Sequence, residues 1–168
     1  MKHSFLLLFL ILTSWISQAQ TGTTVLRLVG DTAYAYDHSV NAPARSKSEL
    51  FNRAKRFLRT ELDASDNTFN ADSLSFDSLQ SIGFLKLPNV EGLTNIVVDF
   101  SASFKPTDGT LRFDASNFNL HAFGANGDSY DPTLEDLNDF TEPQRTAIYR
   151  AFDSRWTDLI ARLDRLGR

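Results

Sequence analysis

The stretch from residue 96 to residue 122, IVVDFSASFKPTDGTLRFDASNFNLHA, decides the fold. Over residues 96–105 apolar side chains alternate with polar ones, the period of two that indicates a strand with one buried face. Residues 106–109, Pro-Thr-Asp-Gly, are typical of a turn, because proline presets φ and glycine accepts a positive φ. Residues 111–122 alternate again, but the apolar positions pass from odd to even numbers, so we expect a β-bulge near Ser116-Asn117. The stretch therefore predicts a long antiparallel hairpin.

Further strands are predicted on the N-terminal side of this hairpin. Residues 25–29 and 33–40 indicate two strands, or one that continues, around a turn at Gly30-Asp31. Residues 79–87 indicate another strand, which Pro88 ends. Strands that follow one another without an intervening helix favour an antiparallel sheet. The polar intervals predict loops: 63–75 and 124–132.

Two amphipathic helices complete the predicted fold. Ser46 and Glu49 form a capping box that begins a helix of about 16 residues with one buried side. A second capping box, Thr141 with Gln144, begins a long C-terminal helix over about 142–166, in which Asp158 and Arg162 are spaced as an i,i+4 ion pair. Its apolar stripe serves either the core or a short coiled coil. Before it, residues 133–136 predict a single helical turn.

The N-terminus has the three parts of a secretory signal peptide. A positive start at Lys2 precedes an apolar run over residues 5–12, and the small residues Ser17 and Ala19 come just before Gln20. An apolar run of about 8 residues is too short to span a membrane, which takes about 20. The sequence therefore predicts export to the periplasm or the medium, with cleavage before Gln20.

Removing residues 1–19 leaves residues 20–168, which suit a single α+β domain: an antiparallel sheet of about five strands with both helices on one face. Cysteine is absent, so disulfides, thiolate metal sites and lipidation at the cleavage site are excluded. The formal charge of −4 becomes −5 without Lys2, which argues against nucleic acid as a partner.

Two motifs lie in the predicted helix and the late strand. The helix motif consists of Ser46, Lys47, Glu49, Leu50, Phe51, Arg53 and Phe57. The late-strand motif consists of Asp108, Gly109, Leu111, Arg112, Phe113 and Phe118. Together they resemble a family of secreted bacterial proteins, the domain-of-unknown-function family numbered 4468, which has a TBP-like fold. In this chain Phe replaces the Tyr and Trp of the family motifs, and Thr110 replaces a basic residue. The similarity covers about residues 34–123 and implies a TBP-like fold in a Bacteroides-type bacterium. It brings no catalytic residue.

Candidate chemistry is sparse. His38 and His121 could meet across the sheet in a hydrolytic or metal site, but no motif spacing supports either. The acids between residues 126 and 142 have calcium-binding residue types without the spacing, and those of residues 63–72 are similar. The acids are Asp63, Asp66, Asp72, Asp128, Asp131, Glu135, Asp136, Asp139 and Glu142. We therefore predict no catalytic, cofactor-binding or metal residue.

The sequence favours an exported, non-enzymatic binding or interaction module with a possible protein partner. Two alternatives stay open: a small hydrolase with a site around His38 or His121, and a carrier of an apolar ligand. In a carrier, strand aromatics would line the cavity instead of the core. These aromatics are Phe100, Phe104, Phe113 and Phe118.

Overall fold

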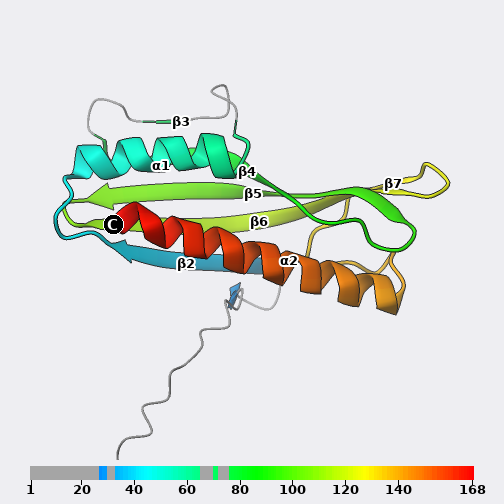
Figure 1. Ribbon diagram of the computed structural model, residues 1–168. Coiled ribbons are helices and arrows are strands. Elements are labelled where there is room, and N and C mark those ends of the chain that lie inside the picture. The colour runs from blue at the N-terminus through cyan, green and yellow to red at the C-terminus, as the bar shows by residue number, and fades with distance from the viewer. Residues whose placement is uncertain (1–26, 30–32, 65–69, 72–75) are drawn as a thin grey trace, which may run out of the picture.

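A long β-hairpin forms the centre of the computed structural model, which describes residues 27–29, 33–64, 70–71 and 76–168 (Figure 1). Its strands are β5 (Leu93–Thr107) and β6 (Thr110–Gly124), paired antiparallel from the turn outward. Ser101 lies opposite Ser116 but Asp99 opposite Asn119, so two residues of β6 face one residue of β5. Asn117, at this point, has φ +56. The predicted bulge is confirmed, and beyond it even-numbered residues face inward.

Further strands pair with both edges of this hairpin. β2 (Ala33–Asn41) pairs with β6, and β4 (Leu79–Lys86) pairs with β5. Three short strands add to the sheet, and every pairing is antiparallel: β1 (Arg27–Val29) on β2, β3 (Asn70–Ala71) on β4 and β7 (Ser129–Tyr130) on β6. The predicted antiparallel sheet is confirmed.

Two of these short strands lie in intervals predicted to be loops. β3 lies within 63–75 and β7 within 124–132, because backbone groups of β4 and β6 are open for pairing there. Residues 65–69 and 72–75 lie outside the described residues, as does the predicted signal peptide at 1–19. Residues 133–136 form a hydrogen-bonded turn, with Asp136 N donating to Thr133 O at 3.1 Å, instead of the expected helical turn.

Both helices lie on the same face of the sheet (Figure 1). In α1 (Lys47–Glu61) the Ser46 hydroxyl accepts from Glu49 N, but the Glu49 carboxylate binds Arg45 instead of returning to the cap. In α2 (Glu142–Leu163) Thr141 N donates to Gln144 Oε1 at 3.0 Å, as predicted. A short 3₁₀ helix, η2 (Asp164–Gly167), follows directly.

The core fills the space between the helices and the sheet. Trp156 of α2 is its centre, with ring centroids 5.2–5.5 Å from those of its neighbours. These neighbours are Tyr36, Phe100, Phe118 and Phe152. The strand aromatics are therefore core residues, and α2 belongs to the fold instead of forming a separate coiled coil. No helix in the described residues is long and apolar enough to cross a membrane.

Candidate functional site

The two histidines lie on opposite faces of the sheet. Successive side chains of β2 point to opposite faces of the sheet, and that of His38 faces the helices, whereas that of Ser39 faces away from them. There His38 Nε2 is 2.7 Å from Asp164 Oδ1 of η2. His121 lies between Leu120 and Ala122, which are both buried on the helix side, so its imidazole faces away. The expectation that both could form one site is wrong, because side chains of opposite parity leave a sheet in opposite directions.

His121 instead joins two carboxylates on the open face of the sheet. Its Nδ1 hydrogen bonds with Asp131 Oδ1 at 2.7 Å, and its Nε2 lies 3.3 Å from Asp99 Oδ1. The bond to Asp131 raises the pKa of His121 above 6.5, and the pKa of Asp131 is lowered by the same contact. Ser129 Oγ donates to Asp131 at 3.2 Å, so this serine contacts the acid and not the imidazole. The arrangement lacks the serine–imidazole contact of a hydrolytic triad.

The acidic segment between residues 126 and 142 stabilises turns and caps. Asp128 N donates to Asn126 Oδ1 at 3.3 Å, Glu135 accepts from Tyr34 N, and Glu142 pairs with Arg145. In the parts of the chain that the structure describes, no group of three or more His, Asp or Glu side chains could hold a metal ion. Asp63 pairs with Lys86 at 3.3 Å, whereas Asp66 and Asp72 lie outside the described residues.

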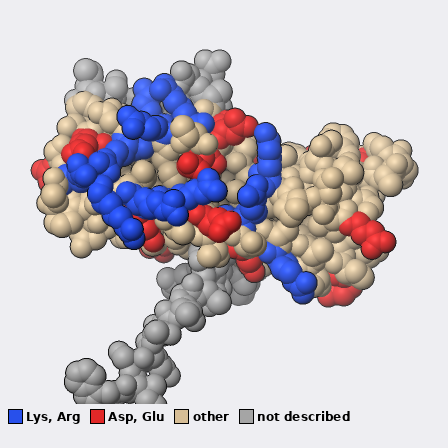
Figure 2. All heavy atoms as spheres, in the orientation of Figure 1, with Lys and Arg blue, Asp and Glu red and all other residues tan. Residues whose placement is uncertain are grey.

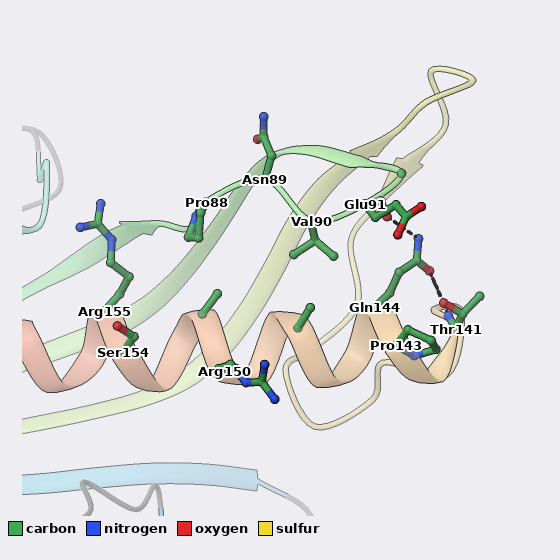
Figure 3. Close-up of a pocket in the computed structure, with 13 residues that line it drawn as sticks. Pro88, Asn89, Val90, Glu91, Thr141, Pro143, Gln144, Arg150, Ser154 and Arg155 are labelled. Carbon is green, nitrogen blue, oxygen red and sulfur yellow. Dashed lines mark hydrogen bonds between the residues drawn. The ribbon is translucent and has the colours of Figure 1, made fainter.

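A cleft of about 850 Å³ lies where the N-terminal half of α2 passes the connection between β4 and β5 (Figure 3). Pro88 and Val90 form one wall, and Ala147 and Ala151 of α2 form the other. Alanines at this i,i+4 spacing share one face of the helix. Their small side chains leave open the space that the bulkier core residues fill farther along α2.

Two side chains of α2 hold the opposite wall in place. Gln144 Nε2 donates to Glu91 O at 3.2 Å at one end, and Arg155 Nε donates to Lys86 O at 3.2 Å at the other. Gly92, beside Glu91, has φ +77, a conformation that glycine adopts without strain. Eleven residues of helix separate the two donors, which corresponds to about 16 Å. These two hydrogen bonds therefore join the walls of the cleft at both of its ends.

The lining suits a small ligand that is mostly apolar. Polar groups lie at its margins: the hydroxyls of Thr141 and Ser154, the amide of Asn89 and the guanidinium of Arg155. Ligand sites usually have volumes of about 300–1,000 Å³, with few polar groups on apolar walls. Sequence reasoning missed this site. The available signal was the run of small residues Ala147, Ala151 and Ser154 on one side of a helix whose other side is bulky.

Comparison with solved structures defines the class of fold. A TBP-like protein from Parabacteroides distasonis superposes with a TM-score of 0.62 over 85% of this chain and 97% of that one, at 12% sequence identity. A DUF4468 family protein from Bacteroides ovatus gives a TM-score of 0.50 over 83% of each chain, at 9% identity. No protein-family model and no curated protein matches the sequence.

The chain thus has the TBP-like α+β fold. The particular resemblance that the helix and late-strand motifs indicate, to the domain-of-unknown-function family numbered 4468, is confirmed at the level of the fold by the second of these structures.

Proposed function

We propose that this chain is an exported, non-enzymatic binding module that holds a small, mostly apolar ligand in the cleft between α2 and residues 88–92. The observation that carries the proposal is the hollow, whose two walls are joined at both ends by Gln144 and Arg155. A rigid site of this kind binds without the cost of ordering its walls.

The chemistry of the lining supports binding over catalysis. Its hydroxyl groups, on Thr141 and Ser154, have no imidazole beside them, because His38 and His121 line other parts of the sheet. A hydroxyl nucleophile needs an adjacent base to be activated. The mostly apolar walls would instead contribute affinity by removing apolar ligand surface from water.

Support for export comes from the sequence of the first nineteen residues. A positive start, an apolar run and small residues at the predicted cleavage site are together typical of signal peptides. A module outside the cytoplasm would meet its ligand in the periplasm or in the medium.

Ligand binding is tested with the neutral fluorescent probe N-phenyl-1-naphthylamine and the purified mature chain. We expect saturable fluorescence enhancement that Ala147→Trp abolishes, because an indole at this position fills the hollow. Ala151→Leu is a milder second variant and should weaken binding. Thr146→Trp adds the same indole at an exposed α2 position outside the cleft lining and should leave binding unchanged.

The outcome that contradicts the proposal is equal enhancement in the three variants and the unaltered chain, with melting temperatures that show all of them folded. If binding instead depends on the cleft as expected, the natively purified protein is extracted, and mass spectrometry of the extract identifies the natural ligand. We expect a molecule of low polarity that Ala147→Trp fails to retain.

A further inference from the structure

A second hollow, of about 910 Å³, lies on the outer side of the helical layer between α1 and the C-terminal end of α2 with η2. Leu166 and Ala161 contribute apolar surface to it, and Asn52 and Thr60 contribute polar groups from α1. Figure 2 shows lysines and arginines gathered around this part of the surface, over α1 and the C-terminal half of α2. It is separate from the cleft described above, which involves the N-terminal half of α2. We call it the interhelical groove.

Charge is distributed unevenly along this acidic chain. Residues 45–63 and 155–168, which flank the groove, carry ten basic and five acidic side chains. The rest of the chain has seven basic and sixteen acidic ones. A positive region on a protein of net charge −4 raises the local concentration of anions, an effect that net charge alone would not predict.

Some of these cations have a structural role. Arg53 donates to Leu166 O at 2.8 Å and to Glu49, which fastens α1 to the C-terminal segment. Arg162 binds Glu61 of α1 at 2.6 Å. The predicted pair of Arg162 with Asp158 is therefore wrong, because the carboxylate on the facing helix takes its place.

Two other arginines line the groove without such a role. Arg56 lies on α1 and Arg165 on η2, so they approach the groove from its two sides. Within the described ranges neither guanidinium has a hydrogen bond or an ion pair. Asp158 is the remaining carboxylate of the lining and forms no ion pair there either. Two unpaired guanidinium groups thus share the groove with one unpaired carboxylate.

We propose that the interhelical groove binds a small phosphorylated molecule, with its phosphate held between Arg56 and Arg165. A guanidinium presents a planar fork of donors that matches phosphate oxygens, and such charge-assisted bonds are stronger than neutral ones. The apolar surface of Leu166 and Ala161 would take the part of the ligand that is not charged. The groove is recessed, and a flat bilayer surface would contact only the helix ridges that border it. The shape therefore favours a discrete molecule over a membrane.

The probe for this proposal is phenyl phosphate, titrated against the mature chain by NMR chemical-shift mapping in buffer of constant ionic strength. We expect saturable shifts at residues of the groove, with tighter binding than for inorganic phosphate because of the phenyl ring. Arg56→Ala and Arg165→Ala should each weaken binding by about tenfold or more, while melting temperatures stay unchanged.

Arg112→Ala is the matched control, because Arg112 is an exposed arginine on β6 that lines neither the groove nor the cleft. It removes the same charge and should leave the affinity for phenyl phosphate unchanged. The proposal fails if the three variants bind alike, or if sodium chloride at equal ionic strength gives the same shifts. It also fails if vesicles of phosphatidylglycerol bind in an Arg56-dependent way while phenyl phosphate does not. The result is independent of the N-phenyl-1-naphthylamine experiment on the cleft.

Discussion

Trp156 contacts more aromatic rings than its helix neighbours do, and it makes these contacts with both strands of the central hairpin through Phe100 and Phe118. Its indole is buried, and its Nε1 has no hydrogen-bond partner among the described residues. Burial of an unpaired donor costs about 1–3 kcal/mol. The side chain therefore stabilises the core by its size and shape alone, against a cost from its one polar atom.

Substitutions of Trp156 separate these two contributions. Trp156→Ala should lower the free energy of unfolding by about 3–5 kcal/mol, because it leaves a cavity in the aromatic cluster. Trp156→Phe should cost much less, since it keeps most of the apolar contact and removes the unpaired N–H. Urea denaturation followed by circular dichroism measures both values. Equal losses in the two variants would show that the indole nitrogen finds a partner in solution.

The contact of His121 with Asp131 should make stability depend on pH. Because the folded pKa of His121 is raised above the unfolded value of about 6.5, its contribution is complete below that pH. It is lost as the pH rises through the folded pKa. The pKa of Asp131 is lowered, so the same contact is also lost in strong acid, as the pH falls through that value.

We expect an NMR titration to place the pKa of His121 above the ordinary histidine value, and Asp131→Asn to bring it down. Asp139→Asn removes the same charge from an exposed position of the neighbouring segment and should leave the His121 titration unaltered. A His121 pKa that does not respond to Asp131→Asn would contradict the assignment of the shift to this hydrogen bond.

At the scale of the elements, α2 has two halves that differ in what they pack against. Its C-terminal half buries Trp156, Leu159 and Leu163 against the sheet. Its N-terminal half buries Ile148 and Phe152 in the core and leaves Ala147 and Ala151 beside the cleft. The helix is thus structural along its whole length, and its N-terminal half also forms a wall of the proposed binding site.

Leu159→Asp should destabilise the domain strongly, because an unpaired carboxylate would enter an apolar contact that leaves Leu159 only 4% exposed. Thr157→Asp places the same charge on the exposed side of the same turn and should have little effect. Cutting the chain after Phe140 should likewise unfold or aggregate it. Thermal melts and size-exclusion chromatography give the answer. A truncated chain that stays folded and monomeric would show that α2 is dispensable.

The main elements could be predicted from the sequence, because they depend on local pattern, whereas the two-residue strands β3 and β7 lie in intervals predicted as loops. The alternation over residues 96–122 predicts the hairpin and its bulge, and capping residues begin both helices where the structure begins them. The cleft could not be predicted, because its two walls come from residues 88–92 and 141–155, which tertiary packing brings together. Arg162 illustrates the same limit, since its partner Glu61 lies on the other helix.

At the scale of the whole molecule, the predicted export can be checked on the intact chain. Protein recovered from the periplasm or the medium should have the mass of a chain that begins at Gln20. Ala19→Arg should block this processing, because the cleavage site requires a small residue at that position. Ala35→Arg, far from the site, is the control and should be processed normally. Full-length protein retained in the cytoplasm would contradict the prediction.

The two ends of the sheet also differ in which helices cover them. At one end α1 and the C-terminal half of α2 cover the sheet together, and at the other the N-terminal half of α2 lies beside the β4–β5 connection (Figure 1). The rings around Trp156 are not among the residues that line the cleft, whereas Val90 and Ala151 both line the cleft and pack against the core.

In the proposed binding module, substitutions at Ala147 and Ser154 would change which molecules fit the cleft, while the rings around Trp156 keep the domain folded. The TBP-like protein of Parabacteroides distasonis has the same architecture at 12% sequence identity, so very different sequences can form this fold. We expect ligand preference to evolve faster than architecture among proteins of this fold.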